Sequence, residues 1–482
     1  MRRVILLLVD GLRPDVAEEA LARGELPALS AMLAGGSRGR GITAFPSTTT
    51  VAYLPFLTGR TPGECNVPSI RWLDRSAYSG RWWRERDVVR SYCGYQAGFV
   101  DRDIPADVPT VFEAIPESIG IFTPISRGLT PRRNPSRTER QLWGALAHYA
   151  MWHQPSDQSV SRHLLRAVDG PWRLIFAQFP AVDGYTHRSS PDGPHVLRAL
   201  RAVDRTMGRL RARLSRRGEL EETLVLVVSD HGAAVVEHHL DLADWFRDQG
   251  VPTLSHPILW ERNPRAAVMV AGNGSAMVYA RPNERRETRW SLARLRSPEA
   301  FGINRDLVAA LASEPSVALV AAEERTGEVR VASGIAAAQQ AAIVREGERI
   351  HYQPISGDPL GLGGPVSGTA GEWLDRTWDA PYPDACVQLL DQFTATRTGD
   401  LVVVAREGFD FRDRFEIPEH RSGHGSLIRA HMQVPVWSSH PRPDRPVRTV
   451  ELHREMMTWL EGAPQSREIE ANPPSPLAAV VA

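Results

Sequence analysis

Aspartates and histidines follow several of the apolar runs in this 482-residue chain. The candidate residues are Asp10 after VILLLV, Asp183 and His187 after LIFAQF, Asp230 and His231 after TLVLVVS, and His424 in RSGHGSL, beyond LVVVA. Carboxylate oxygens and neutral imidazoles together suit Zn²⁺ or Mn²⁺. Each residue alone also has an ordinary explanation, because an Asp after a strand often caps a helix and His-Gly often forms a turn. Their joint occurrence favours a metal site.

The apolar runs themselves predict buried parallel strands, because they are short, continuous and rich in branched side chains. We expect strands at 4–9, 119–122, 173–179, 223–230 and 401–405. Helices are expected at 16–23, 27–34 and, most clearly, 195–214, where apolar residues recur at spacings of three and four. This alternation indicates a doubly wound, mostly parallel α/β sheet with helices on both faces. Ligands bind such sheets at the carboxyl ends of the strands, where the candidate residues lie.

The middle of the chain has a different texture. From about residue 250 to 380, short strand-like pieces lie among glycine, proline and charged residues. We interpret 251–380 as an inserted α+β cap subdomain, and 1–250 with 381–462 as the catalytic core. The last segment, 463–482, is rich in proline and alanine and is expected to be a flexible tail.

Composition excludes several classes of function. The 57 basic and 57 acidic residues cancel, so no overall field favours nucleic acid or an anionic membrane. All 57 basic residues are arginine, which excludes a P-loop lysine, a kinase lysine and a pyridoxal phosphate Schiff base. The three cysteines fit neither a disulfide framework nor a zinc knuckle, which favours a reducing compartment. No apolar run is long enough for a signal peptide or a membrane span, so we expect a cytoplasmic protein.

Three consecutive threonines, Thr48 to Thr50, stand in the stretch AFPSTTTVAYLPFLTG. Threonine is a poor residue for the middle of a helix, because its branched Cβ loses χ1 freedom there. The apolar run after them predicts a helix that begins at this point. Free backbone N–H groups at its start can bind an anion. The alternative is that the threonines only cap the helix.

The motifs VDGLRPD, FPSTTT…LTGRTP, DGYTH, SDHG and HGS follow one another along the chain. In this order they resemble the alkaline phosphatase superfamily, and in particular its type I phosphodiesterase/nucleotide pyrophosphatase family. The resemblance implies an alkaline-phosphatase-like α/β fold and a metal-dependent hydrolase of phosphate esters, acting on phosphodiesters or nucleotide pyrophosphates. It also implies two divalent metal ions, Zn²⁺ with Mn²⁺ as the alternative.

The resemblance further assigns a role to each matching position. Asp183, His187 and His424 would hold one metal ion, whereas Asp10, Asp230 and His231 would hold the other. Thr49, three residues after the proline of FPS, would be the nucleophile and form a phosphothreonine intermediate. Thr48 or Thr50 would replace it if the register of the motif shifts by one residue.

The chain departs from the family pattern beyond the nucleophile. Many of these diesterases carry there an asparagine that hydrogen-bonds a phosphoryl oxygen, but a direct count reaches Ile70 in this chain. Asn66 and Arg71 are the candidates to contact the phosphate instead. A guanidinium favours a dianionic monoester, whereas an amide tolerates a diester. The aromatic segment 71–83 is either a binding wall for a nucleobase or lipid chain, or a packed loop.

Other activities remain as alternatives. A phosphomonoesterase, a phosphomutase or a phospho-group transferase of the same superfamily would use related residues. A sulfatase would need a C/S-x-P-x-R motif, which TTTVA lacks, and the GGSRG at 35–39 lacks the preceding strand of an acyl hydrolase elbow. We therefore expect a small-molecule phosphate ester, nucleotide or lipid-like, as substrate rather than a nucleic acid polymer. The oligomeric state is not indicated.

Overall fold

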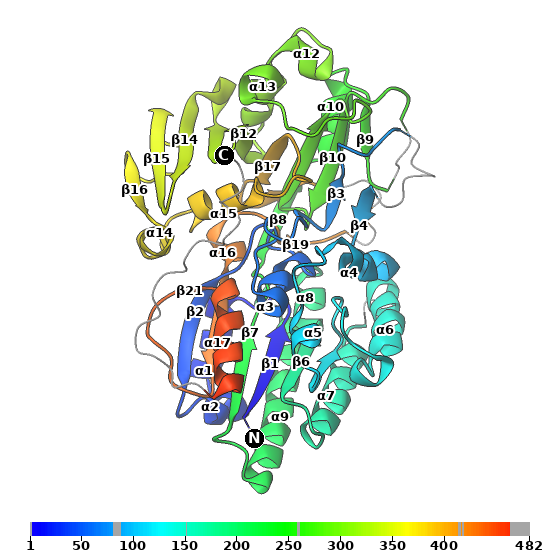
Figure 1. The fold of residues 1–482 in the computed structure, drawn as a ribbon, viewed down its shortest axis with the longest axis vertical. Helices are drawn as coiled ribbons and strands as arrows, with labels where there is room; N and C mark the ends of the chain where they lie inside the picture. Colours follow the sequence, from blue (N-terminus) through cyan, green and yellow to red (C-terminus); the bar gives the residue numbers. More distant parts are fainter. Residues whose placement is uncertain are drawn as a thin grey trace.

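A seven-stranded sheet forms the half of the molecule that contains the N-terminus (Figure 1). The computed structural model describes residues 2–80, 88–150, 152–257, 261–412, 416 and 419–462, so the expected tail at 463–482 lies outside the described residues. In order across the sheet, the strands are β21 (Val447–Arg448), β2 (Ser37–Ile42), β20 (Gln433–Ser438), β7 (Thr223–Val228), β1 (Arg3–Val9), β6 (Leu174–Phe179) and β5 (Ser118–Ile121). β1 is parallel to β6 and β7, β5 is parallel to β6, and β20 is antiparallel to its two neighbours. The expectation of a mostly parallel sheet is confirmed.

Helices cover both faces of this sheet, which explains why β1 is apolar from Val4 to Val9. Alternate residues of β1 enter two separate cores. One core also contains residues of α1 (Pro14–Ala22), α2 (Pro27–Met32), α7 (Gln154–Val168) and α9 (Pro194–Arg217). The other contains residues of α3 (Leu54–Thr58), α5 (Val111–Ala114) and α17 (Thr449–Glu461). A strand that is buried on both faces needs a continuous apolar run, as the sequence has there.

A second, nine-stranded sheet builds the other half (Figure 1). Its strands, in order, are β16 (Val366–Thr369), β15 (Arg349–Ser356), β14 (Gln339–Glu346), β13 (Glu328–Ser333), β12 (Val317–Arg325), β17 (Leu401–Ala405), β11 (Ser275–Ala280), β10 (Ala266–Ala271) and β9 (Thr253–Ser255). All neighbouring strands are antiparallel except β9 and β10. This sheet is thus almost entirely antiparallel, whereas the seven-stranded sheet is mostly parallel.

One strand lies in a different sheet from the one we expected. The run 401–405 was assigned to the parallel core, but β17 pairs antiparallel with β11 and β12. Leu401, Val403 and Ala405 enter one core of the second sheet, and Val402 and Val404 enter the other. Burial on both faces produces the same continuous apolar run in either sheet. The second sheet therefore extends beyond residue 380, the limit that we expected for the inserted subdomain.

The remaining helices are shorter or lie at the edges. They are α4 (Val100–Asp103), α6 (Arg137–Ala150), α8 (Ala181–Thr186), α10 (Leu242–Asp248), α11 (Leu292–Leu295), α12 (Pro298–Phe301), α13 (Leu307–Ala312), α14 (Ala370–Thr377), α15 (Ala385–Gln392) and α16 (Arg429–Met432). Short 3₁₀ segments occur at η1 (Val51–Tyr53), η2 (Gly94–Phe99), η3 (Pro131–Arg133) and η4 (Ile335–Ala337). Within the described residues, no helix is long and apolar enough to cross a membrane.

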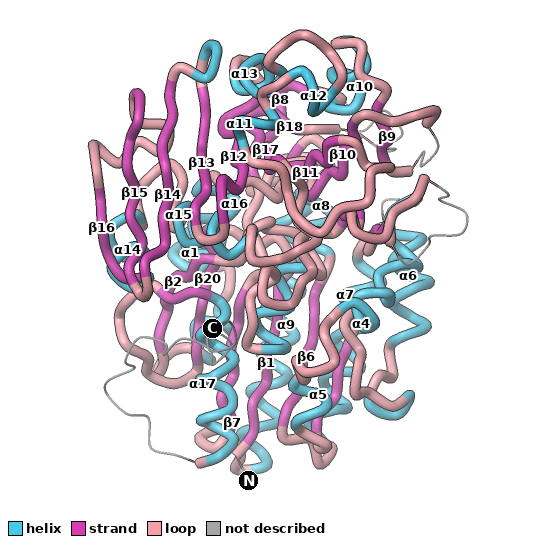
Figure 2. Tube along the Cα trace, turned by 45° about the horizontal axis from the view of Figure 1, so that its top comes forward, coloured by secondary structure: helices cyan, strands magenta, loops and turns pink. Residues whose placement is uncertain are grey.

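Small sheets lie where the two halves meet. β8 (Ala234–His239) pairs with β18 (Gly408–Asp410) and β19 (Ser422–Gly423), and β3 (Arg71–Leu73) pairs with β4 (Val89–Ser91). In Figure 1, α3, α8, β8 and β19 lie between the two large sheets, and Figure 2 shows loops crowded in the same region. The segments that follow β1, β6 and β7 therefore reach the boundary between the halves.

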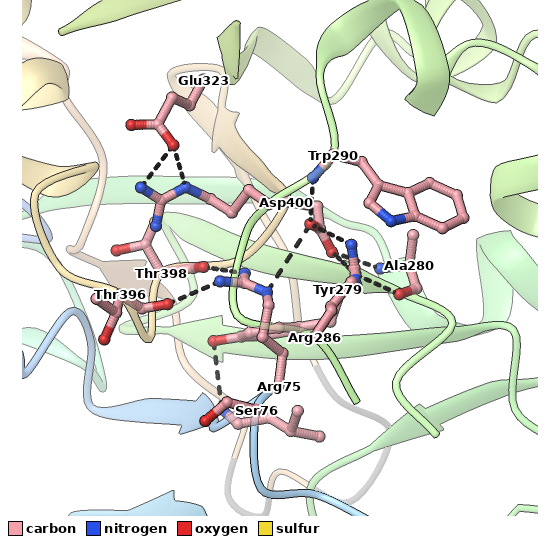
Figure 3. A network of polar contacts seen from close by, with 12 residues as sticks. Arg75, Ser76, Tyr279, Ala280, Arg286, Trp290, Glu323, Thr396, Thr398 and Asp400 are labelled. Carbon is pink, nitrogen blue, oxygen red and sulfur yellow. Dashed lines mark hydrogen bonds and ion pairs between the residues drawn. The ribbon is translucent and has the colours of Figure 1, made fainter. Parts of the chain in front are cut away.

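A buried ionic network joins the loop after β3 to the second sheet (Figure 3). Asp400 is fully buried and accepts hydrogen bonds from the backbone N–H groups of Ala280 (2.9 Å) and Trp290 (3.2 Å) and from Arg286 (2.5 Å). The Nε atom of Arg75 lies 3.9 Å from Asp400, and its other nitrogens donate to backbone carbonyls of the loop before Asp400. The network ties the segment beyond the threonines to the second sheet.

Candidate active site

The carboxyl ends of three adjacent strands carry five of the six candidate ligands. Asp10 directly follows β1, Asp183 and His187 lie on or just after α8, which follows β6, and Asp230 and His231 follow β7. Gly11 turns the chain after Asp10 with a φ of +69°, and a Cβ at that position would lie 2.8 Å from the Asp183 side chain. A glycine is therefore needed for the β1 and β6 connections to approach each other so closely.

His424 reaches the same place from the C-terminal part of the chain. It directly follows β19, and a hairpin turn of the second sheet holds its backbone. Gly274 N–H donates to the His424 carbonyl (2.8 Å), and His424 N–H donates to the Gly272 carbonyl (3.3 Å). The turn between β10 and β11 thus positions a residue of the cluster, so both halves of the molecule contribute to the site.

The six candidate ligands lie together. Within the described residues, two groups have potential ligand atoms within 4.8 Å of one another: Asp10 with Asp230 and His231, and Asp183 with His231 and His424. His187 Nε2 lies 3.2 Å from Asp183 Oδ2, and its ring centroid is 5.2 Å from that of His424. His231 belongs to both groups, whereas we had assigned it to one metal ion. The division of these ligands between two ions stays a prediction.

Hydrogen bonds orient the three imidazoles in the same way. The Nδ1 atoms of His187, His231 and His424 lie 2.9 to 3.0 Å from backbone carbonyl oxygens of Ser422, Gly232 and Ser47. A carbonyl only accepts, so each Nδ1 must carry the proton, and in the neutral form of each ring Nε2 is the acceptor. Metal-ligating histidines commonly have this second hydrogen bond. All three rings are therefore prepared to act as ligands through Nε2.

The carboxylates of the cluster perturb one another. Burial, followed by the charges of Asp230 and Asp183, raises the pKa of Asp10 well above its ordinary value. Burial and then Asp183 raise the pKa of Asp230 to about 7. For Asp183, burial acts in the same direction, but the neighbouring His187, His424 and His231 lower its pKa overall. Burial lowers the pKa of His187, but the negative charge of Asp183 outweighs this effect and raises the pKa to about 9. The protein places these negative charges together at a free-energy cost.

Two buried oxygen atoms of the cluster have no hydrogen-bond partner among the described residues, Asp183 Oδ1 and Asp230 Oδ2. Buried polar atoms are paired in nearly all folded proteins, so such atoms need an explanation. Cations would provide the missing partners and would also offset the repulsion between the carboxylates. Oxygen and imidazole nitrogen donors fit Zn²⁺ or Mn²⁺. The residues present therefore fit divalent metal ions.

Sequence reasoning missed two residues that hold Asp10 in place. Gln178 Nε2 donates to Asp10 Oδ2 (2.6 Å), and the Tyr53 hydroxyl donates to the same oxygen (3.4 Å). These contacts leave Asp10 Oδ1 facing Thr49 and His231. Gln178 is the only polar residue of the buried strand β6, and this was the signal that could have identified it.

Thr49 differs from its two neighbours. Thr48 and Thr50 are buried, whereas Thr49 is partly exposed, and its Oγ1 lies 3.3 Å from Asp10 Oδ1 and 3.1 Å from His231 Nε2. Thr48 Oγ1 instead points to the Pro46 carbonyl, at 3.5 Å. The helix expected after the threonines consists of the 3₁₀ turn η1 followed by the short helix α3. Of the three hydroxyls, that of Thr49 faces the cluster.

Comparison with known proteins identifies the family. A sequence model of the type I phosphodiesterase / nucleotide pyrophosphatase family matches residues 4–427. The chain belongs to this family. It is therefore an enzyme, a phosphoester hydrolase of the phosphodiesterase/pyrophosphatase type. No curated protein sequence matches the chain at a significant level.

Solved structures of similar fold support the alkaline-phosphatase-like architecture. Phosphonoacetate hydrolase from Sinorhizobium meliloti 1021, in complex with phosphonoacetate, has a TM-score of 0.57 and 14% identity over 95% of this chain and 96% of that chain. Murine ectonucleotide pyrophosphatase/phosphodiesterase 5 has a TM-score of 0.53 and 12% identity, and its human counterpart 0.55 and 11%, each over 95% of both chains. At such identities the likeness concerns the fold.

The two residues suggested for phosphate contact differ in their surroundings. The Asn66 side chain donates to Thr396 Oγ1 (3.0 Å) and accepts from the Arg397 N–H (3.2 Å), so it is engaged with a loop of the second sheet. Arg71 donates to the Val270 carbonyl (3.3 Å), and its buried Nε has no partner among the described residues. Val270 lies two residues before Gly272, where a Cβ would come within 2.7 Å of the His424 ring. Arg71 is therefore the better placed of the two.

The aromatic segment 71–83 lies only partly within the described residues. Trp72 is fully buried and belongs to the core that contains α3 and α17. Its indole N–H donates to the Tyr92 hydroxyl (2.9 Å). Trp72 is thus a packed residue, whereas Trp82 and Trp83 lie outside the described residues.

Proposed function

We propose that this member of the family hydrolyses phosphodiesters or nucleotide pyrophosphates through a phosphothreonine intermediate on Thr49. The observation that carries the proposal is the position of the Thr49 hydroxyl, 3.3 Å from Asp10 and 3.1 Å from His231 at the edge of the acidic cluster. A partly exposed hydroxyl beside converging carboxylates and imidazoles is the arrangement that an activated alcohol nucleophile needs. The reported complex of a threonine-to-alanine, inactive form of murine ectonucleotide pyrophosphatase/phosphodiesterase 5 with AMP is consistent with a threonine nucleophile and a nucleotide ligand in this family.

Two divalent metal ions, Zn²⁺ or alternatively Mn²⁺, complete the proposed site. Their ligands would be the six side chains of the cluster: Asp10, Asp183, His187, Asp230, His231 and His424. When bound, such ions act as Lewis acids, which lower the pKa of a nearby hydroxyl and neutralise charge on the phosphoryl oxygens. The unpartnered oxygens of Asp183 and Asp230 support this assignment.

The residues of the chain then perform two displacements. Thr49 Oγ1 attacks phosphorus, its bond to phosphorus forms, and the bond between phosphorus and the leaving oxygen breaks. Asp10 Oδ1 is the acceptor within reach of the Thr49 proton, whereas His231 Nε2, which also lies near the hydroxyl, would be occupied as a metal ligand. Water then attacks the phosphothreonine, the phosphorus–Oγ1 bond breaks, and Thr49 regains its proton. Gln178 and Tyr53 keep Asp10 oriented through both steps. Arg71 is the proposed contact for a phosphoryl oxygen.

A substitution at Thr49 tests the nucleophile. We expect Thr49→Ala to lower the turnover of bis-p-nitrophenyl phosphate by about 10³-fold or more, because it removes the atom that forms the covalent bond. Thr49→Ser should retain measurable activity. Metal content, measured by mass spectrometry of the purified proteins, should be equal in both variants and in the native enzyme. Acid quenching during turnover should trap phosphate on Thr49 in the native enzyme. Undiminished turnover by the Thr49→Ala enzyme would exclude this residue as the nucleophile.

A substrate panel tests the substrate class. We propose that a diester or a nucleotide pyrophosphate is turned over faster than p-nitrophenyl phosphate by the metal-loaded enzyme. A phosphomonoesterase would show the opposite order, a phosphomutase would isomerise the phosphate, and a transferase would pass the group to an acceptor other than water. Arg71→Gln should raise KM for monoesters more than for diesters, since a monoester carries the additional charge. The cytoplasmic location expected from the sequence stays a prediction.

A further inference from the structure

A groove lies between α7 and α9, on the flank of the seven-stranded sheet. Its volume is about 460 Å³, and residues of α7, α9 and the β6–α8 connection line it. This volume is within the usual range for sites that bind small molecules. Neither Thr49 nor any of the six proposed metal ligands lines the groove. It is therefore a different site from the proposed catalytic one.

The floor of the groove is apolar and partly aromatic. Leu165 and Phe179 are buried side chains of its lining, and Ala199 and Ala202 continue this surface along α9. Tyr185 also lines the groove, and its ring packs against those of His153 (5.0 Å between centroids) and His195 (5.5 Å). These packed side chains give the groove a fixed shape that suits a ring or a short acyl chain.

Arginines on one side of α9 line the same groove. Arg198, Arg205 and Arg209 are exposed, and none of their side chains has a hydrogen bond or ion pair with another described residue. Three other arginines of α9 are paired, Arg201 with Glu25 (2.7 Å), Arg213 with Asp169 and Arg217 with Glu219 (2.7 Å). The positions 198, 205 and 209 recur at helical spacing, so the three cationic groups face the same way. The edge of the groove is therefore positively charged and available to an anion.

A buried carboxyl group completes the lining. Asp157 is 5% exposed, and its Oδ1 accepts from the Ala181 N–H (3.1 Å). Its Oδ2 has no hydrogen-bond partner among the described residues. Desolvation without a partner destabilises the folded protein, so a buried oxygen of this kind calls for an explanation. A hydroxyl group of a ligand would supply the missing hydrogen bond.

We infer that this groove binds a small organic anion with an aromatic or acyl body that carries a hydroxyl group. The carboxylate or phosphate of the ligand would pair with Arg205 and Arg209, its body would cover Leu165 and Phe179, and its hydroxyl would meet Asp157. This site extends beyond the proposed phosphodiesterase activity and does not depend on it.

Fluorescence of 8-anilinonaphthalene-1-sulfonate, an aromatic anion, tests the binding site. The full-length protein is treated with a chelator first, so that the anion cannot bind to metal ions at the catalytic site. We expect saturable binding with one site per chain. Arg205→Glu should weaken it at least tenfold, because the substitution reverses a charge of the groove, whereas Arg211→Glu, an exposed substitution on α9 outside the lining, should change it less than twofold. No saturable binding, or equal effects of the two substitutions, would overturn the proposal.

Displacement of the dye by two matched ligands tests the role of Asp157. 4-Hydroxyphenylacetate differs from phenylacetate only by a hydroxyl group, and we expect it to displace the dye at a concentration at least fivefold lower. Asp157→Ala should abolish this difference while the dye still binds. Equal displacement by the two ligands in the native protein, or an unchanged preference in the variant, would overturn the assignment. The ligand pair gives this answer on the native protein even if the variant fails to fold.

Discussion

At the scale of single residues, the candidate site depends on the hydrogen bonds behind it. Each of the three histidines donates from Nδ1 to a backbone carbonyl, which leaves Nε2 directed to the cluster. Gln178 and Tyr53 orient Asp10 in a similar way, because both donate to its Oδ2 atom and leave Oδ1 directed to the cluster. Residues that never touch a substrate thus determine how the proposed ligands point.

Substitution of Gln178 tests this control of Asp10. Gln178→Leu keeps the strand apolar but removes the donor to Asp10 Oδ2, so we expect the affinity for Zn²⁺ to fall about tenfold. Competition with a chromophoric chelator measures the affinity, and excess Zn²⁺ should restore most of the activity. Gln353→Leu, at an exposed position of β15, is the control and should leave the affinity unchanged. An unaltered affinity in the Gln178→Leu enzyme would contradict the positioning role.

The buried carboxyl group of Asp157 makes stability depend on pH. Burial raises its pKa from 3.8 to about 7, so the folded protein binds a proton that the unfolded chain has lost between these values. The contribution of this group is therefore most favourable below pH 3.8 and declines as the pH rises to about 7. An asparagine does not titrate and retains the oxygen that accepts from Ala181.

We accordingly expect the change in the free energy of unfolding caused by Asp157→Asn to be more favourable at pH 8 than at pH 4, by about 1 kcal/mol or more. Thermal unfolding of both proteins across this range measures the difference. The control is Asp192→Asn, at an exposed loop position, whose effect should not vary with pH in the same way. A gain that is as large at pH 4 as at pH 8 would show that Asp157 is not the titrating group.

At the scale of elements, the start of η1 stores backbone strain beside the proposed nucleophile. Thr50, the residue before η1, has φ +76° and ψ −51°, a conformation that is unfavourable for a β-branched side chain. The tight turn leaves Thr48 and Thr50 buried and Thr49 facing the cluster. We interpret this strain as the free-energy cost of the turn that directs the Thr49 hydroxyl, and not those of its two neighbours, toward the cluster.

Replacement of Thr50 by glycine separates stability from activity. Thr50→Gly should stabilise the fold by about 1 kcal/mol, since relief of the strain exceeds the added entropy of the unfolded chain. It should also lower kcat, because Thr49 would be held less firmly. Thr48→Gly, at a neighbouring position without positive φ, should destabilise instead. Unfolding curves and turnover numbers of the two variants provide the comparison, and a less stable Thr50→Gly protein would refute the assignment of strain.

At the scale of the whole molecule, the second sheet completes the candidate site rather than only covering it. The turn between β10 and β11 holds His424 by two backbone hydrogen bonds, and the Asp400 network fixes the same sheet to the segment that follows the threonines (Figure 3). Asp400 is buried with Arg75 and Arg286 around it. A loss of its charge would leave the buried guanidinium group of Arg75 and the partly buried one of Arg286 without a carboxylate partner.

Asp400→Asn should therefore destabilise the protein by about 3 kcal/mol or more, as is typical when one partner of a buried ion pair is removed. We expect a lower thermal midpoint and a parallel loss of activity, since His424 depends on the same sheet. Asp375→Asn, on the exposed side of α14, serves as the control and should have little effect on either quantity. Equal thermal midpoints of the two variants would mean that the Asp400 network contributes little to holding the two halves of the molecule together.

Much of the architecture could be predicted from the chain alone. The strands at β1, β5, β6 and β7 and the long helix α9 followed from local patterns of apolar residues, which report burial directly. The Asp and His residues after these runs singled out six metal-ligand candidates, and the family resemblance singled out Thr49. The structure brings all seven together, although their roles stay predictions. Residue type and spacing are properties of short segments, and a sequence displays them without any knowledge of distant partners.

Other features were decided only by the tertiary structure. β17 lies in the second sheet, and the sequence could not show this. A run that is buried on both faces looks the same in either sheet, and the partner strands of β17 lie far away in the sequence. The contacts of Gln178 with Asp10, of Asn66 with Thr396, and of His231 with both groups of ligands depend on which segments meet in space. The groove between α7 and α9 likewise exists only after packing. Local periodicity reports how deeply a residue is buried, whereas the identity of its neighbours is a long-range property of the folded chain.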